Sequence, residues 1–484
     1  MIAFRAAQGA SWLIFSRFLG RIIDFCTLMI LARILSPGDF GMAALAMSLV
    51  MIVDTILEIP VVQVLVRLET VTTSHLDTAF TLSAMRGALT TLIILAAAWP
   101  FSTFNNDPHL LPLVAVLSAG PLAKGLLSPA MVYFARDLGF RQTFLLEIAG
   151  KLGGFAAATF TVLSGGSYWA IVANFVTVSL IATAASYVLA PYRPHISLKR
   201  FSDFVGFLGW SSSSQLVAAI NWQFDRILIG GFAGKPALGQ YAVASDVSAL
   251  PTQSLIGPAL QPMMAAFSLI ASNPDRLRKA FLKTARFAML LAVPACVGIS
   301  LTADLVTQLL LGEKWAGAVP FLSILALSVI PVPYFQALCS ISLALNRPRI
   351  IFRLNVIDLA FRILLISIGF YLFTTSGVAG ARVALSIIMA VFYLKAARSL
   401  LHLPVRAQLM NLWKIAVAAA FMSAWVFLLR AELQELNWNA LTNLALIATS
   451  GAAVYLASLF ALGLRLEAGA GRLALSDRWL VAER

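Results

Sequence analysis

The chain is 484 residues long, and its composition differs from that of a water-soluble globular protein. Apolar residues make up 60% of the sequence and charged residues only 12%, whereas about 25% of the residues of a soluble domain are charged. Because a bilayer core about 30 Å thick requires about 20 apolar residues per helix, this composition can supply a dozen or more membrane-spanning helices. A soluble enzyme, a secreted domain and a disordered protein are therefore excluded.

Windows of about 20 residues, each ended by polar residues, Gly or Pro, predict fourteen membrane-spanning helices. They lie at 11–33, 41–66, 79–100, 110–132, 141–163, 167–190, 205–232, 238–268, 284–303, 318–345, 350–372, 378–399, 411–429 and 441–463. Three prolines and Asp246 interrupt the eighth segment, which predicts a kinked or broken helix there. The predicted fold class is all-α and integral to the membrane.

Lys and Arg residues outside the predicted helices or at their ends are divided unequally between the two sides of the membrane. The side that holds both termini carries 23 of them, and the other side carries three: Lys235, Lys314 and Arg430. Because cytoplasmic loops of membrane proteins are enriched in Lys and Arg, both termini are predicted to be cytoplasmic. The net charge of +14 then reflects topology, with anionic membrane lipids as secondary partners, and a nucleic-acid partner is not required.

The loops predict no catalytic or metal-binding centre. The longest predicted outer loop, at 430–439, has about ten residues, and the four histidines occur singly in loops. Neither the spacing of metal ligands nor a phosphate-binding glycine loop occurs in the sequence. We therefore predict a protein that is not an enzyme and that holds no metal or organic cofactor.

An internal repeat divides the chain. A shift of 198 residues superimposes the first predicted helix on the seventh and aligns, among others, Trp12 with Trp210, Gly41 with Gly239 and Ala44 with Ala242. Six helices separate the copies, so both have the same orientation and are related by a pseudo-two-fold axis along the membrane normal. We predict a six-helix lobe at 1–200, a second at 201–404, and two additional helices with a short cytoplasmic tail at 405–484.

Sixteen ionisable residues lie within the predicted helices. A charge near the bilayer centre costs roughly 2.5–3.5 kcal/mol on insertion scales, so most of these side chains must face water or one another. The sixteen residues are Arg17, Arg21, Arg33, Arg86, Lys124, Lys151, Arg226, Arg362, Arg382, Asp24, Asp54, Glu58, Glu147, Asp225, Asp246 and Asp358.

The first helix has the pattern most typical of a binding site. Arg17, Arg21 and Asp24 are spaced i, i+4, i+7, which places two cations and one acid on a single helix face. Other predicted helices can add cations to the same cavity, which would then bind a phosphate-bearing substrate. These additional candidates are Arg86, Lys124, Lys151 and Arg362. Buried structural ion pairs are the alternative explanation.

Two further pairs have an explanation within a single helix. Glu147 and Lys151, and likewise Asp358 and Arg362, are spaced i, i+4 with the acid first, so each acid can neutralise the cation on its own helix. This interpretation stands beside the substrate-binding one for Lys151 and Arg362.

Three acids are candidates for coupling transport to an ion gradient. Asp54 and Glu58 are spaced i, i+4, and two like charges on one face favour protonation of at least one of them. Together with Asp24, they predict a role in binding H⁺ or Na⁺.

Four segments resemble one family of membrane transporters. The turn after the first predicted helix reads ARILSPGDFG at 32–41, and the second half contains DRILIG at 225–230, LGQY at 238–241 and LGEKW at 311–315. These segments are similar to the polysaccharide transporter branch of the multidrug/oligosaccharidyl-lipid/polysaccharide (MOP) flippase superfamily. The resemblance extends in order over nearly the whole chain.

The resemblance implies a bacterial inner-membrane flippase of two six-helix lobes. Its substrate would be an undecaprenyl-pyrophosphate-linked oligosaccharide, moved from the cytoplasmic to the periplasmic leaflet by alternating access for exopolysaccharide or O-antigen-type lipopolysaccharide synthesis. A polysaccharide polymerase and chain-length machinery are the implied protein partners. The alternatives are a cation-coupled multidrug exporter of the same superfamily and, third, a membrane glycan polymerase or glycosyltransferase.

Overall fold

A computed structural model describes residues 2–59, 61–68, 70–137, 140–205, 209–260, 262–435, 438–469 and 472–477. The chain forms two compact units. Unit 1 comprises Met1–Val243 and Asn355–Thr375, and unit 2 comprises Ala244–Leu354 and Ser376–Arg484. The predicted lobe boundaries at residues 200 and 404 follow the sequence repeat and stay a prediction.

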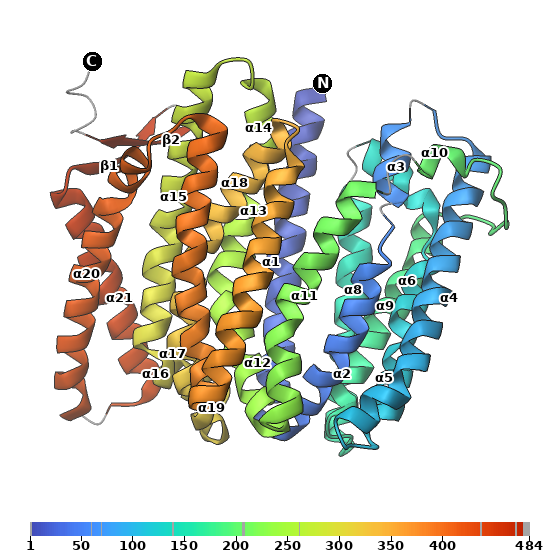
Figure 1. Cartoon of the computed structure of the whole chain (residues 1–484), viewed down its shortest axis with the longest axis horizontal. Coiled ribbons are helices and arrows are strands. Elements are labelled where there is room, and N and C mark those ends of the chain that lie inside the picture. The colour runs from blue at the N-terminus through green and yellow to red at the C-terminus, as the bar shows by residue number, and fades with distance from the viewer. Residues whose placement is uncertain are drawn as a thin grey trace. The chain divides into compact units, whose positions relative to one another are not determined.

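Unit 1 contains the helices of the first part of the chain, of which α8 and α9 lie side by side (Figure 1). Its elements are α1 (Ile2–Ile34), α2 (Pro37–Ile56), α3 (Val61–Arg67), α4 (Thr73–Phe104), α5 (Leu110–Leu117), α6 (Ala119–Gly125), the short 3₁₀ helix η1 (Pro129–Met131), α7 (Val132–Arg136), α8 (Phe140–Leu163), α9 (Trp169–Leu189), α10 (Ser202–Val205), α11 (Gly209–Phe232), the beginning of α12 (Lys235–Leu250) and the part of α19 (Pro348–Leu401) from Asn355 to Thr375.

Unit 2 contains most of the remaining helices, and its last two long helices, α20 and α21, pack against each other (Figure 1). Its elements are the π-helix η2 (Pro251–Ile256), α13 (Gly257–Leu260), α14 (Met263–Leu269), α15 (Pro274–Leu301), α16 (Ala303–Leu310), the 3₁₀ helix η3 (Glu313–Ala318), α17 (Val319–Ser328), α18 (Val332–Ala344), the second part of α19 (Pro348–Leu401), α20 (Val405–Glu435), α21 (Ala440–Ala461), and the antiparallel strands β1 (Leu464–Gly469) and β2 (Arg472–Asp477).

Nine helical segments in the described part of the chain are long and apolar enough to cross a membrane. They cover ten of the fourteen predicted spans, because α19 covers two. The other four predicted spans fall on α1, on α5 with α6, on α11, and on the series from α12 to α14. The all-α integral membrane fold is confirmed, and the chain is a multi-pass membrane protein.

Regular α-helical backbone is interrupted at Pro251 and again at Phe373 and Thr374. The eighth span was expected to break, and its α-helix gives way to a π-helix at Pro251, where proline removes a backbone donor and a turn widens. The eleventh and twelfth spans form the single element α19, but Phe373 and Thr374 have non-helical backbone angles, with φ of +54° at Thr374. The two predicted helices are therefore separated by a sharp break rather than by a loop.

The segment SPGDFG starts α2 through a complete capping box. The Ser36 hydroxyl accepts a hydrogen bond from the Asp39 amide (3.2 Å), and the Asp39 carboxylate accepts one from the Ser36 amide (2.9 Å). Pro37 occupies the first turn, where its missing N–H costs no helical hydrogen bond. Ser167, in the turn before α9, donates to the same Asp39 carboxylate, so the motif fixes both the start of α2 and its neighbour.

Two glycines at equivalent repeat positions face each other where α2 crosses α12. A Cβ on Gly41 would lie 1.8 Å from the carbonyl oxygen of Lys235, and a Cβ on Gly239 would lie 1.8 Å from that of Pro37. A shift of 198 residues converts each of these contacts into the other. This reciprocity is the contact pattern of a local two-fold axis, so it supports the predicted repeat, and it requires glycine at both positions.

The segment that follows α9 packs on the start of α4. The Tyr192 hydroxyl donates to Asp77 (2.6 Å), and the Ser197 amide donates to the Thr81 hydroxyl (2.9 Å). Burial and the neighbouring Asp77 carboxylate raise the pKa of Tyr192 above its ordinary value. The connection at the predicted end of the first lobe is thus held by specific hydrogen bonds.

Candidate functional site

The charges of α1 and α8 join these two helices. The Lys151 ammonium lies 2.5 Å from the Asp24 carboxylate and 3.2 Å from the Gly20 carbonyl oxygen. One turn away, the Ser16 hydroxyl donates to the Glu147 carboxylate at 2.7 Å. The first helix is therefore held against α8 by three polar contacts.

This arrangement corrects the expected neutralisation within α8. The spacing of Glu147 and Lys151 predicted an ion pair along one helix, but each side chain reaches across to α1 instead. Gly20 makes this possible, because a Cβ there would lie 3.2 Å from the Lys151 Nζ and 3.3 Å from the Glu147 Oε1. The absence of a side chain at Gly20 thus leaves room for the Lys151 and Glu147 side chains against α1.

Arg86 and Lys124 share one carboxylate partner. The Arg86 guanidinium lies 2.6 Å from one Asp54 oxygen, and the Lys124 ammonium lies 3.4 Å from the other. Arg86 also donates to the backbone carbonyls of Asp54 and Leu57 at the end of α2. A cation at a helix C-terminus stabilises the unsatisfied carbonyls and the helix dipole, so Arg86 holds α2 to α4.

Asp54 and Glu58 do not form the like-charge pair that their spacing suggested. Helix α2 ends at Ile56, and the exposed Glu58 lies in the following turn. Asp54 contacts two cations, whereas Glu58 makes no ion pair with any residue in the described ranges. Of the three predicted coupling acids, Asp24 and Asp54 therefore have cationic partners, and Glu58 is left without one in this part of the structure.

Arg362 lies in a buried cluster that joins α11, α12 and α19. Its guanidinium is 2.9 Å from Asp358, one turn earlier on α19, and 3.4 Å from Asp225 on α11. The Tyr241 hydroxyl donates to Asp225 at 2.8 Å. Side chains of Arg362, Asp225 and Tyr241 are all buried, with exposed fractions of 9%, 2% and 1%. The predicted Asp358–Arg362 pair is confirmed, and a second carboxylate completes it.

The sequence prediction omitted two members of this cluster from the candidate site. The sequence identifies Asp225 only as an intramembrane charge, and no charge pattern points to Tyr241. Both lie in segments of the family resemblance, DRILIG and LGQY. Their place in these segments is the signal that could have identified them. A charge in a membrane helix needs polar partners, so Asp225 in DRILIG points to a partner elsewhere in the chain.

Arg17 and Arg21 differ from the other four candidate cations. Arg17 is half-buried and Arg21 is exposed on α1. Within the described ranges, neither guanidinium makes an ion pair or hydrogen bond, whereas Arg86, Lys124, Lys151 and Arg362 each contact a carboxylate. Two arginines one turn apart thus leave ten N–H donors for a ligand, in the geometry that binds phosphate oxygens.

No group of three or more His, Cys, Asp or Glu side chains converges in the part of the chain that the structure describes. The site of unit 1 is therefore an arrangement of cations and their carboxylate partners, and the chemistry that it offers is electrostatic binding of an anion.

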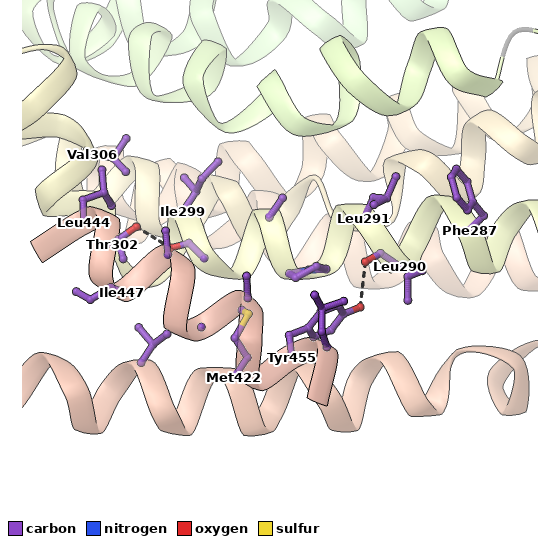
Figure 2. A pocket seen from close by; sticks show the side chains of 18 residues that line it. Phe287, Leu290, Leu291, Ile299, Thr302, Val306, Met422, Leu444, Ile447 and Tyr455 are labelled. Carbon is purple, nitrogen blue, oxygen red and sulfur yellow. Dashed lines mark hydrogen bonds between the residues drawn. The ribbon is translucent and has the colours of Figure 1, made fainter. Parts of the chain in front are cut away.

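Unit 2 contains an apolar pocket between α15, α16, α20 and α21 (Figure 2). Its volume is about 620 Å³, within the range of pockets that enclose a small ligand. Leu290 and Leu291 of α15 line it together with Met422 of α20 and Tyr455 of α21. The Tyr455 hydroxyl donates to the Leu290 carbonyl oxygen at 3.0 Å, so the most polar lining group is internally satisfied and the pocket suits hydrocarbon.

Comparisons with known proteins place these features in context. A family model described as "Polysaccharide biosynthesis protein" matches residues 30–320. The chain is 22% identical over 360 residues to the lipopolysaccharide biosynthesis protein WzxC of Escherichia coli (strain K12), covering 73% of this chain and 72% of that protein. It is 24% identical to the succinoglycan biosynthesis transport protein ExoT of Rhizobium meliloti (strain 1021), covering 63% of this chain and 62% of that one.

A solved structure has the same fold. The lipid II flippase MurJ, in an inward closed conformation, superimposes with a TM-score of 0.76 and 14% sequence identity, covering 92% of this chain and 97% of that one. At this identity the likeness concerns the fold, which is that of a transporter built from membrane helices.

Proposed function

We propose that this chain, which belongs to the polysaccharide biosynthesis protein family, is a flippase for undecaprenyl-pyrophosphate-linked oligosaccharide repeats. The repeats would move from the cytoplasmic to the periplasmic leaflet of the bacterial inner membrane, with both termini of the protein in the cytoplasm. The polymer supplied would be an exopolysaccharide or an O-antigen-type chain. The protein then acts as a transporter and not as an enzyme.

The observation that carries this proposal is the pair Arg17 and Arg21. An unpaired charge in a membrane helix is costly unless it faces water or a ligand of opposite charge. A pyrophosphate supplies that charge, and adjacent guanidinium groups bind its oxygens in bidentate fashion. The sugar would occupy the same hydrated space, while the prenyl chain remains among lipids.

The paired cations of the predicted site take a second role in the proposal. Lys151, Arg86, Lys124 and Arg362 hold helices together through carboxylates in this conformation. A phosphate that approached Lys151 or Lys124 would compete with Asp24 or Asp54 for the same ammonium. Substrate binding would thereby alter contacts between helices, which is what alternating access requires.

Energy for transport is proposed to come from an H⁺ or Na⁺ gradient that acts through Asp24, Asp54 or Glu58. Protonation or Na⁺ binding at Asp24 or Asp54 would weaken the hold of its carboxylate on the neighbouring cation. Reconstituted vesicles with an imposed pH or Na⁺ gradient test this part. Equal transport with and without either gradient would exclude it.

The decisive experiment is deletion of the gene, followed by complementation with variants. Surface polysaccharide and lipid-linked repeats on the cytoplasmic face are quantified in each strain. We expect the deletion, Arg17→Ala and Arg21→Ala to lose polymer and accumulate complete repeats inside, at unchanged protein abundance. Arg353→Gln, which removes an exposed cation at the start of α19, serves as the matched control.

Two outcomes would contradict the proposal. Unchanged polymer in a deletion strain without a second flippase would favour the drug exporter, which competition with organic cations would then reveal. Loss of long polymer with single repeats still reaching the surface would indicate a polymerase. Copurification with the polymerase and chain-length machinery tests the proposed protein partners.

A further inference from the structure

One face of α15 combines exposed lysines with the apolar pocket of unit 2. Lys279 and Lys283 lie near the start of the helix, followed at the same spacing of four residues by Phe287, Leu291 and Ala295. Each step of four residues turns about 40° around an α-helix, so Lys283 lies close to the face of Phe287, whereas Lys279 and Ala295 lie on different faces. Both lysines do lie in line with pocket-lining residues, because Leu290 and Pro294 follow Lys279 and Lys283 by eleven residues, or about three helical turns. Both lysines are exposed, and the three residues that follow line the pocket. The face is therefore cationic at one end and apolar along the rest.

The pocket is open toward the surroundings of the helices. Phe287, Leu291 and Leu456 line it with exposed fractions of 39%, 46% and 56%. The lining runs along α15 from Phe287 to Thr302, the residue after the helix ends (Figure 2), and these fifteen residue steps correspond to about 22 Å at 1.5 Å per residue. A groove of this length covers most of a bilayer core about 30 Å thick, so it can hold an extended hydrocarbon chain.

The start of α15 carries an excess of positive charge. Residues 274–286 contain five cations, Arg276, Arg278, Lys279, Lys283 and Arg286, against the single acid Asp275. Asp275 already contacts Arg278 at 3.2 Å. Long lysine side chains can extend along a membrane helix to the headgroup level, and each adds to the attraction of an anionic headgroup.

We propose that α15, α20 and α21 form a binding site for an anionic phospholipid of the bilayer. The phosphate is held by Lys279 and Lys283, and an acyl chain lies in the pocket. The pocket volume of about 620 Å³ is large enough for an acyl chain. A zwitterionic lipid lacks the net negative charge that the two lysines would bind. The site is distinct from Arg17 and Arg21, and it stands whatever substrate the protein transports.

Lipid titrations of the purified full-length chain in detergent test this proposal, with bound lipid counted by native mass spectrometry. Dioleoylphosphatidylglycerol and dioleoylphosphatidylcholine have identical chains, so they isolate the effect of headgroup charge. We expect phosphatidylglycerol to bind more tightly, by about fivefold for each lysine. The double variant Lys279→Gln/Lys283→Gln should equalise the two affinities, and Lys199→Gln, in the segment after α9, should leave them unchanged.

Pocket occupancy is tested by a filling variant. A Cβ on Gly298 meets nothing within 4 Å, so Gly298→Leu places a side chain in the pocket without a backbone clash. We expect it to weaken binding of both lipids at least tenfold. Gly380→Leu is the matched control, because Gly380 is also an open helical position but lies outside the pocket lining.

Three results would overturn the proposal. Equal binding of the two lipids would exclude recognition of the headgroup. Unchanged binding by the Gly298→Leu variant would exclude the pocket. Displacement of phosphatidylglycerol by an equimolar amount of polyprenyl phosphate, lost in the Gly298→Leu variant, would assign the pocket to the carrier lipid instead.

Discussion

Helices α1 and α11 are equivalent in the sequence repeat, yet their charges differ. The shift of 198 residues places uncharged residues of α11 on the three charged candidate residues of α1: Gln215 on Arg17, Ala219 on Arg21 and Trp222 on Asp24. The acid of α11, Asp225, lies elsewhere on the helix and is surrounded by Arg362 and Tyr241. The two helices therefore occupy equivalent positions in the repeat but carry their charged residues at different positions.

This difference distinguishes the residues that both copies of the repeat need for helix packing from the charged residues that occur in only one copy. The helices that follow α1 and α11 keep the same close crossing, with Gly41 and Gly239 in exchangeable positions. The charges of α1 have no counterpart at the equivalent positions of α11, so packing of the repeat does not demand them. We propose that Arg17 and Arg21 serve a ligand, whereas Arg362 contacts two carboxylates of the protein itself.

Removing Arg362 should have the largest effect on stability. Arg362→Gln removes the cation that contacts buried Asp225 and half-buried Asp358, and loss of one partner of a buried ion pair typically costs about 3–5 kcal/mol. Thermal unfolding of the purified protein and its abundance in membranes measure this loss. Arg353→Gln, at an exposed position on the same helix, should change neither, and an equally mild effect of both variants would contradict the structural role of Arg362.

Substitution of Gly41 or Gly239 should cause the second-largest loss of stability, and the loss should be similar for the two glycines. Gly41→Ala and Gly239→Ala each force a Cβ against a backbone oxygen at 1.8 Å, and overpacking of this kind costs about 2–3 kcal/mol. Thermal unfolding in detergent measures both variants. Gly231→Ala is the control, since its Cβ would meet only atoms at 3.8 Å. Loss in one variant but not the other would break the equivalence of the two copies.

The ion pair between α1 and α8 should contribute less to the free energy of unfolding than the Arg362 cluster or the paired glycines. Lys151→Gln removes the ion pair with Asp24, whose side chain is 46% exposed, so solvent screening limits the loss to about 1 kcal/mol. Unfolding at low and high salt measures it, and the difference from the natural chain should shrink as salt rises. A loss of stability as large as that of Arg362→Gln would contradict the expected difference between this partly exposed ion pair and the buried Arg362 cluster.

Substitution of Arg17 and Arg21 should have the smallest effect on stability and the largest effect on transport. The double variant Arg17→Gln/Arg21→Ala gives α1 the residues that α11 has at equivalent positions. Because neither guanidinium contacts a carboxylate in the described ranges, stability should change by less than about 0.5 kcal/mol, whereas export of lipid-linked repeats should fall more than tenfold. Marked unfolding of this variant would show that the two arginines are structural.

The sequence was informative wherever partners lie on one helix or one repeat. Hydropathy located ten spans that form long apolar helices, prolines located the break at Pro251, and the i, i+4 spacing identified Asp358 and Arg362 as partners. The shift of 198 residues identified the two glycines that pack at one crossing. Each of these features depends on distances along the chain.

The sequence was less informative wherever partners lie on different helices. Lys151 takes Asp24 rather than Glu147 because of how α1 and α8 are rotated, and rotation depends on packing that spacing does not record. Asp54 gained two cations from α4 and α6 for the same reason. Hydropathy likewise missed that α2 ends before Glu58, which removed a like-charge pair from the candidate site.

The cluster around Asp225 also constrains the order of events during synthesis. Tyr241 follows Asp225 by 16 residues, whereas Arg362 follows it by 137. At roughly 5–20 residues per second, the ribosome needs about 7–27 s to add those 137 residues. For that interval α11 is in the nascent chain before its arginine exists, and the Tyr241 hydroxyl is the first of the cluster's partners that can bind the Asp225 carboxylate.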